Sequence, residues 1–268
     1  MGKLPNWLGE LKNLRGLYLS DNKLEGPIPA SLWALQHLEY LYLRLNKLNG
    51  TLLDSIGQLS QLQYLDVSSN HLSGSLSEQH FWKLRKLEYL HMESYSFHLN
   101  VSSNWVPPFQ ANYLNMGSCH LGPSFLAWLQ SQKNLWYLDF SNDNILGLIP
   151  NWFWNISFNL HHLNFSHNQL QGQLPNSLNF SIGDAYISFS FNRFEGPIPL
   201  VKRLDLSHNK FSGHIPLSRG ESMLGLSSLL LSNNQITGAI MLDIGKSMPN
   251  LSYLSLSSNQ ITGSSHQT

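Results

Sequence analysis

The stretch Leu17-Tyr18-Leu19-Ser20-Asp21-Asn22-Lys23-Leu24-Glu25-Gly26-Pro27-Ile28-Pro29 recurs, with variations, along nearly the whole chain. We number its copies by the position of Asn22, which is called the slot from here on. The slot is occupied in turn by Asn22, Asn46, Asn70, Tyr95, Cys119, Asp143, Asn168, Asn192, Asn209, Asn234 and Asn259. Successive slots are 24 or 25 residues apart, except for one step of 17. A period kept in phase over eleven copies predicts one stacked architecture for residues 1–268.

Each position of the repeat has a physical role. Leu17 and Leu19 alternate with Tyr18 and Ser20, which predicts a short strand whose leucines point inward. Stacked copies then form a parallel sheet. The amide of Asn22 can satisfy backbone groups of the turn and of the neighbouring copy, which would otherwise be buried and unpaired. The glycine that follows permits a backbone path that a Cβ would block, and we expect one or two helical turns on the side opposite the sheet.

The full pattern L-x-x-L-x-L-S-x-N-x-L-x-G-x-I-P resembles the plant-specific class of leucine-rich repeats. The resemblance implies an α/β repeat fold, a right-handed solenoid with a parallel β-sheet on its concave face and short helical or 3-10 turns and loops on its convex face. This class forms the ectodomains of plant receptor kinases and receptor-like proteins, and also the polygalacturonase inhibitors. Residues 99–110 (LNVSSNWVPPFQ) and 117–123 (GSCHLGP) resemble segments of receptor-like proteins of the fungal-xylanase receptor type.

Three slots do not hold asparagine. Cys119 can occupy its slot as a small buried residue, and we interpret it as a structural core thiol. It is the only cysteine of the chain, so no disulfide can form within the chain. Tyr95 and Asp143 depart from the rule, and we expect a local distortion at both.

Two segments interrupt the repeat. Residues 93–112 are irregular, because the paired Pro107 and Pro108 lack amide hydrogens and exclude a regular helix before them; an extended crossing is expected there. Residues 193–209 form a short copy, in which the outer segment has lost seven residues while the strand is kept. We therefore expect the sheet to continue through the short copy.

The two ends lack the cysteine-paired caps that plant members of this class usually carry, and no apolar run typical of a signal peptide or of a membrane span is present. A solenoid without polar caps exposes core leucines at its ends. We therefore interpret the chain as a fragment or a truncated gene product, and we expect fraying or end-to-end association at the ends.

The charges argue against several functions. The 16 Lys and Arg residues balance the 16 Asp and Glu residues, so no electrostatic case exists for nucleic acid or an anionic membrane surface. Of the 12 histidines, His161, His162 and His167 lie close in sequence, but neighbours on a strand point to opposite faces. We expect no metal site and no cofactor. No constellation typical of a catalytic centre was found, so we do not expect an enzyme.

Tyrosine is concentrated on the predicted sheet. The position just before the first inward leucine holds tyrosine in seven copies, namely Tyr40, Tyr64, Tyr89, Tyr113, Tyr137, Tyr186 and Tyr253. Stacking of the copies should place neighbouring tyrosines side by side, about 4.8 Å apart. Tyrosine gives a large contact area and a polar tip, which suits protein recognition. It is also a good strand former that stabilises a ladder, and this structural interpretation stays open.

The candidate binding surface, called the tyrosine strip from here on, consists of Tyr18, Tyr40, Tyr42, Arg44, Tyr64, Asp66, Tyr89, His91, Glu93, Tyr113 and Tyr137. Asp66 also belongs to an outward column with Asp139 and Asp205, for which a structural or solvated role is the alternative. Sequons for N-glycosylation occur at Asn49, Asn100, Asn155, Asn164, Asn179 and Asn250. A glycan on Asn164 would block part of the sheet and favour binding on the first six copies.

The resemblance implies an extracellular protein-recognition module of a plant immune or developmental receptor-like protein. Such a module would bind a microbial elicitor or a peptide at the outer face of the plasma membrane or in the apoplast, and would signal through a partner co-receptor kinase. The alternative is a secreted inhibitor of microbial cell-wall hydrolases, similar to the polygalacturonase inhibitors. The missing cap cysteines and the segment at 99–110 argue against this alternative.

Overall fold

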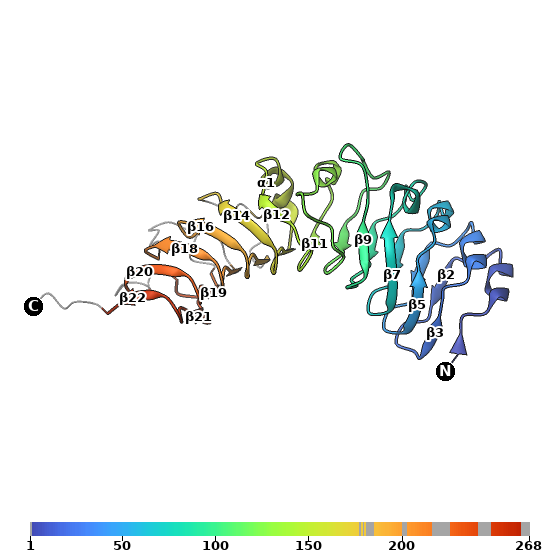
Figure 1. Ribbon diagram of the computed structural model, residues 1–268, viewed down its shortest axis with the longest axis horizontal. Coiled ribbons are helices and arrows are strands. Elements are labelled where there is room, and N and C mark those ends of the chain that lie inside the picture. The colour runs from blue at the N-terminus through green and yellow to red at the C-terminus, as the bar shows by residue number, and fades with distance from the viewer. Residues whose placement is uncertain are drawn as a thin grey trace, which may run out of the picture. The chain divides into compact units, whose positions relative to one another are not determined.

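The computed structural model describes residues 2–176, 178, 180, 185–199, 203–215, 226–240 and 248–263. They form two compact units, one of residues 1–122 and 126–143 and one of residues 123–125 and 144–268. Both units consist of parallel strands in two sheets, which we call the main sheet and the second sheet of each unit. Figure 1 shows the strands of neighbouring copies lying side by side, as for β5 and β7.

In the first unit the main sheet has the strand order β2 (Gly16–Tyr18), β4 (Tyr40–Tyr42), β6 (Tyr64–Asp66), β8 (Tyr89–His91), β10 (Tyr113–Asn115) and β11 (Tyr137–Asp139). The second sheet has the order β1 (Gly2–Lys3), β3 (Leu24–Gly26), β5 (Lys47–Thr51), β7 (His71–Leu76) and β9 (Phe97–Leu99). The expected helical turns are 3-10 helices, η1 (Asn6–Glu10), η2 (Ala30–Ala34), η3 (Asp54–Gln58), η4 (Glu78–His80) and η5 (Ala127–Ser131).

In the second unit the main-sheet strands are β13 (His162–Asn164), β15 (Tyr186–Ser188), β17 (Arg203–Asp205), β19 (Ser228–Leu230) and β21 (Tyr253–Ser255). The second sheet contains β12 (Leu146–Leu148), β14 (Gln169–Gln173), β16 (Arg193–Gly196), β18 (Lys210–Gly213), β20 (Gln235–Ala239) and β22 (Gln260–Thr262). A short α1 (Phe153–Ile156) continues into η6 (Ser157–Asn159).

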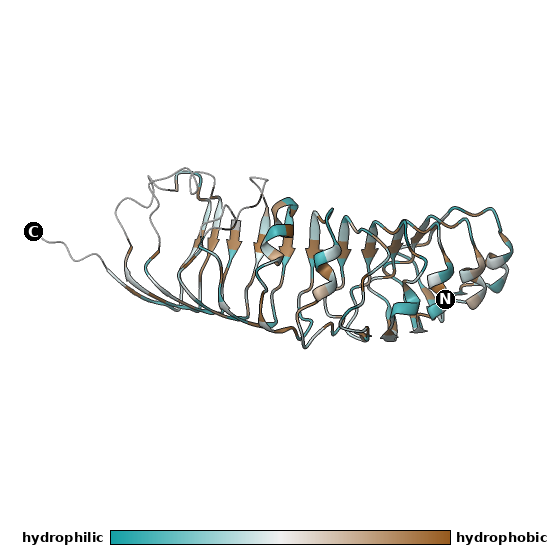
Figure 2. Ribbon diagram, turned by 90° about the horizontal axis from the view of Figure 1, so that it is seen from above, coloured by the Kyte–Doolittle hydropathy of each residue, from teal (hydrophilic) through white to brown (hydrophobic). Residues whose placement is uncertain are grey.

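The core lies between the main sheet and the helical turns, as the alternation of apolar residues predicted. The inward leucines of successive strands, such as Leu41 and Leu65, are at most 1% exposed, and Leu32 and Leu35 close the core from the other side. Figure 2 shows hydrophobic stretches recurring from strand to strand. Burial of each such side chain contributes about 1.5–3 kcal/mol, so adjacent copies hold one another in place.

The slot asparagines after Asn22 join neighbouring copies, as predicted, whereas the side chain of Asn22 bonds its own turn. The amide nitrogen of Asn46 donates to the carbonyl oxygens of Leu19 and Leu43 at 2.8 and 3.0 Å, and its Oδ1 accepts the N–H of Leu24 at 3.0 Å. The residue before the slot has a left-handed backbone, as at Leu45 with φ of 54°. The sequence analysis did not locate this strained position, because asparagine, serine, leucine and phenylalanine all occur there.

The three unusual slots behave differently from one another. Cys119 is fully buried and its thiol donates to the carbonyl oxygen of Met92 at 3.2 Å, where an asparagine amide would donate in a regular copy. Tyr95 turns away from its slot, is 74% exposed, and lacks the left-handed residue before it. Around the slot of Asp143, His120 and Asn144 add two further left-handed residues. The distortions expected at Tyr95 and Asp143 are confirmed.

Of the two interruptions, the range 93–112 contains one short strand, β9. Residues 100–112 contain neither helix nor strand. In the short copy, β17 pairs with β15 and β19, so the main sheet of the second unit continues through it. Asn209 still accepts the N–H of Phe194 at 2.9 Å, although only 15 residues separate the two. The outer residues 200–202 of this copy lie outside the described residues.

Candidate ligand-binding surface

The tyrosine strip is a stack of aromatic rings on the outward face of the first unit's main sheet. The strand register places Tyr40, Tyr64 and Tyr89 opposite one another, and Tyr113 and Tyr137 follow in the same row. Successive ring centroids are 5.1, 5.7, 4.1 and 4.1 Å apart, with nearly parallel planes. The predicted side-by-side arrangement is therefore confirmed, and the rings form a continuous half-buried surface.

A second row begins beside the first. Tyr18 is 65% exposed and stacks on Tyr42 with centroids 5.2 Å apart, which widens the surface at its start. At the other end Trp136, which the sequence analysis did not include, meets Tyr113 edge to face at 5.8 Å and is 45% exposed. The sequence signal that could have found it is its place directly before Tyr137.

The environment of three phenol groups of the strip disfavours their ionisation. Burial raises the pKa of Tyr89 and of Tyr137, and the neighbouring Tyr113 raises both further. Burial also raises the pKa of Tyr42, with smaller effects from adjacent tyrosines. Tyr42, Tyr89 and Tyr137 therefore present hydroxyl groups, and not phenolate charges, to a ligand.

Three charged residues of the strip form a network below and beside the rings. His91 Nδ1 lies 3.3 Å from Asp66 Oδ2, and His91 Nε2 lies 3.5 Å from Glu93 Oε2. Asp66 also accepts the hydroxyl of Ser68 at 2.6 Å. Asp66 is 4% and His91 8% exposed, so the structure places both beneath the surface. Among the three, Glu93 is the residue that reaches solvent.

The two buried charges stabilise each other. Burial alone would lower the pKa of His91, but the carboxylates of Asp66 and Glu93 outweigh it and raise this pKa to about 9. Burial would raise the pKa of Asp66, but the bonds from His91 and Ser68 lower it below its ordinary value. The network thus carries two negative charges and one positive charge at neutral pH.

We expect the imidazole of His91 to titrate near pH 9 in the folded chain, because it loses two anionic partners on deprotonation. Its stabilising contribution is therefore complete below pH 6.5 and is lost as the pH rises through about 9. Histidine ring shifts followed by NMR against pH provide the measurement. The Asp66→Asn variant should lower the pKa of His91; an unchanged value would contradict the assignment.

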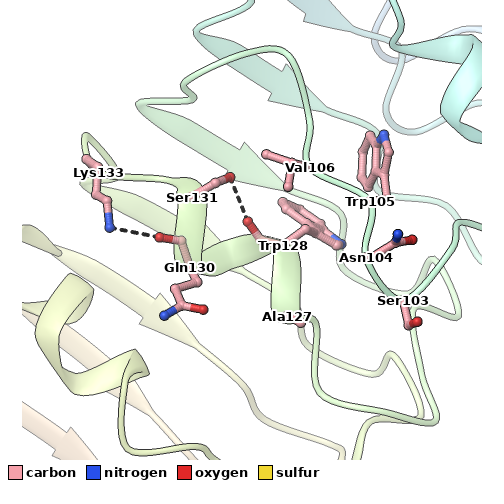
Figure 3. Close-up of a pocket in the computed structure, with 9 residues that line it drawn as sticks. All are labelled: Ser103, Asn104, Trp105, Val106, Ala127, Trp128, Gln130, Ser131 and Lys133. Carbon is pink, nitrogen blue, oxygen red and sulfur yellow. Dashed lines mark hydrogen bonds between the residues drawn. The ribbon is translucent and has the colours of Figure 1, made fainter.

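A cavity of about 410 Å³ lies elsewhere on the first unit, beside η5. Figure 3 shows Trp105 and Val106 above the ring of Trp128, with Lys133 and Gln130 at the other end of the cavity. Trp105 and Trp128 meet edge to face with centroids 5.6 Å apart. Val106 is 64% exposed. Sequence analysis missed this cavity, because the two tryptophans come from different copies.

The sequons differ in exposure. Asn49, Asn100, Asn155 and Asn250 are exposed. Asn164 lies in β13, is partly buried, and its Oδ1 accepts the N–H of Ser166 at 3.1 Å. Asn179 lies outside the described residues. Within the part of the chain that the structure describes, no helix has the length and apolar character needed to cross a membrane.

Comparison with known proteins agrees with this architecture. A sequence profile described as Leucine Rich Repeat matches residues 13–35, 37–59, 61–82, 134–156, 159–180 and 200–219. A second profile of the same description matches residues 247–265. These matches cover more than half of the chain. The chain belongs to the leucine-rich-repeat family.

The relatives place these repeats among those of plant receptors. Receptor-like protein EIX2 of Solanum lycopersicum is 36% identical over 142 residues, which are 53% of this chain and 12% of that protein. The crystal structure of PEPR1-AtPEP1 is 28% identical, with a TM-score of 0.74, over 97% of this chain and 40% of that chain. The ectodomain of the Arabidopsis receptor kinase HAESA, solved with a peptide hormone ligand, is 26% identical with a TM-score of 0.60, over 97% and 52%. The chain thus spans only a small part of the curated relative's length.

Proposed function

We propose that this chain is an extracellular recognition module of a plant receptor-like protein, and that the tyrosine strip contacts its ligand. The observation that carries the proposal is the continuous stack of half-buried rings from Tyr40 to Tyr137. The ligand is a peptide or an extended segment of a protein, including a microbial elicitor. Signalling passes to a co-receptor kinase, and the site of action is the apoplastic side of the plasma membrane.

The rings are suited to this role because they are already ordered. A tyrosine has few rotatable bonds, and each ring of the row is held between its neighbours. Little conformational entropy is therefore lost when a ligand covers the row, which leaves more of the contact energy for affinity. The hydroxyl groups at the ring tips can donate to or accept from the backbone of an extended peptide.

The relatives support the same class of ligand. HAESA was solved in complex with a peptide hormone ligand, and its ectodomain shares the fold over 97% of this chain. EIX2 is a receptor-like protein, which supports a receptor role over an inhibitor role. A secreted inhibitor of cell-wall hydrolases remains the second candidate, and an inhibition assay with fungal hydrolases separates the two.

The first test is selection of short random peptides on the purified chain, followed by measurement of their affinity for variants. Replacing both Tyr64 and Tyr113 by alanine should weaken the selected peptides by about 10- to 100-fold, because central aromatic residues carry most of the binding energy of an interface. The control is Val106→Ser in the cavity beside η5, which should leave the affinity unchanged. If Val106→Ser weakens binding and the tyrosine variant does not, the ligand occupies the cavity, and the strip is structural.

A further inference from the structure

A second cavity opens at the edge of the first unit's main sheet, beside the tyrosine strip. Its volume is about 430 Å³, within the range of ligand-binding pockets. It is lined by Ser69, His71, Glu93, Ser94, Tyr95 and Ser96, together with the slot residue Asn70. Glu93 belongs both to this cavity and to the strip, so the two surfaces are continuous.

The cavity coincides with the irregular copy. In regular copies the slot asparagine turns inward and joins the previous copy, as Asn70 does with the carbonyl oxygen of Leu43 at 2.9 Å. Tyr95 turns outward, and the smaller Ser94 donates to the carbonyl oxygen of Leu72 at 3.1 Å. The departure that sequence analysis found at Tyr95 therefore lies at a hollow in the surface.

The polar groups of the cavity differ in their freedom to bind a ligand. The amide of Asn70 is committed to the chain, because its nitrogen donates to Leu43 and Val67 and its Oδ1 accepts from Leu48. Glu93 keeps a side chain that is 51% exposed, and one of its oxygens faces His91 at 3.5 Å. Tyr95, taken as a whole residue, is 74% exposed.

The charge balance of the cavity is negative. Among the residues that line the cavity, Glu93 carries a carboxylate. The positive charge of His91 is shared with Asp66, whose Oδ2 lies 3.3 Å away, so the three groups together keep one net negative charge. An anionic group would be repelled from this position, whereas a cation would gain a charge-assisted hydrogen bond.

We propose that this cavity binds the basic side chain, arginine or lysine, of a ligand that lies along the tyrosine strip. The guanidinium or ammonium group pairs with the carboxylate of Glu93 and contacts the face of the Tyr95 ring, while the serine hydroxyls accept its remaining hydrogens. The identity of the ligand rests on the proposed function; the affinity of the cavity for a cation does not.

The first experiment tests the cavity without any peptide. Agmatine, which carries a guanidinium group, is titrated into the full chain at low ionic strength, and the amide shifts of residues 94–96 are followed by NMR. Glu93→Gln should weaken the binding of agmatine by at least about tenfold, because the substitution removes the charge of the side chain and keeps its shape. Tyr95→Ser should weaken it by about three- to fivefold. The exposed Glu10→Gln, a matched loss of charge on η1, should change it by less than about twofold.

A neutral analogue completes this experiment. N-Butylurea keeps the planar head and the butyl chain of agmatine but lacks both its guanidinium and its ammonium charge, and it should leave the amide shifts of residues 94–96 unchanged. Binding of agmatine that is equal in the wild-type chain and in Glu93→Gln would overturn the inference, as would the absence of any shift at these residues. Unfolding curves of each variant show whether the fold is retained.

The second experiment tests the cavity with the peptides selected on the strip. Those peptides should share an arginine or lysine at one position, and its replacement by glutamine should weaken binding by about tenfold in the wild-type chain and little in Glu93→Gln. Selected peptides without a basic residue would overturn the inference and leave the strip intact. If agmatine binds but no peptide is selected, the cavity is confirmed as a cation site, and the proposed function fails.

Discussion

Replacing Asn46 by alanine should lower the free energy of unfolding by about 2–4 kcal/mol. The side chain of Asn46 is 7% exposed and bonds the backbone of two copies at once. Alanine would leave the N–H of Leu24 without a partner, and a buried unpaired group costs about 1–3 kcal/mol. The carbonyl oxygens of Leu19 and Leu43 would each lose one of two donors, since Asn22 and Asn70 still bond them, at about 0.5–1.5 kcal/mol each. Urea unfolding followed by circular dichroism measures the loss.

The chain contains a matched control for this substitution. Asn22 occupies the same slot in the first copy, but it is exposed and bonds only carbonyl oxygens of its own turn, those of Leu19 and Ser20. Asn22→Ala should therefore cost less than about 1 kcal/mol. Equal losses at both positions would show that the amide acts within its own turn, and that the bonds between copies contribute little.

The Asp143→Asn variant should raise the stability of the chain and reduce its dependence on pH. Asp143 is fully buried in a slot, and burial raises its pKa from 3.8 to about 8, against the opposing hydrogen bond from the N–H of Cys119 at 2.6 Å. Between these two pH values the side chain is protonated in the folded chain and ionised in the unfolded chain. Unfolding then releases a proton, so stability falls by about 1.4 kcal/mol per pH unit as the pH rises.

The pH window of this measurement separates Asp143 from the other titrating groups. His91 titrates between 6.5 in the unfolded chain and about 9 in the folded chain, so its contribution is constant below pH 6.5. Asp66 and Glu78 have lowered pKa values, and their contributions change at still lower pH. Between pH 5 and pH 6 the difference in stability between Asp143→Asn and the wild-type chain should therefore grow by about 1.4 kcal/mol.

The control for the charge is Asp21→Asn, which removes an exposed carboxylate at the turn before Asn22. The stability of this variant is measured over the same range of pH. Asparagine suits the slot of Asp143 because its amide can donate to a carbonyl oxygen of the previous copy, as at Asn46. A difference between Asp143→Asn and wild type that does not change from pH 5 to pH 6 would show that Asp143 is ionised in the folded chain.

The repeating architecture of this protein follows from its sequence. Leucines that alternate along Leu17 to Leu19 and recur in phase can be buried in only one register, because a slip by one residue would turn them to solvent. The same register dictates which outward residues are neighbours, so the row from Tyr40 to Tyr137 followed from the spacing. The bonds of Asn46 to the previous copy followed as well, because the buried turns need a partner in every copy.

Packing and pairing between copies decide which of the outward residues can reach a ligand. In the sequence, Asp66, His91 and Glu93 were all predicted to belong to the binding strip. In the structure the first two are buried as an ion pair, and of the three Glu93 alone reaches solvent. Similarly, the distortion at Tyr95 was predictable, whereas the cavity beside it was not. Burial, pairing and cavity shape depend on distances between side chains of different copies. Those distances are set by how large neighbours such as Tyr89 and Tyr113 pack, and no pattern within one copy contains that information.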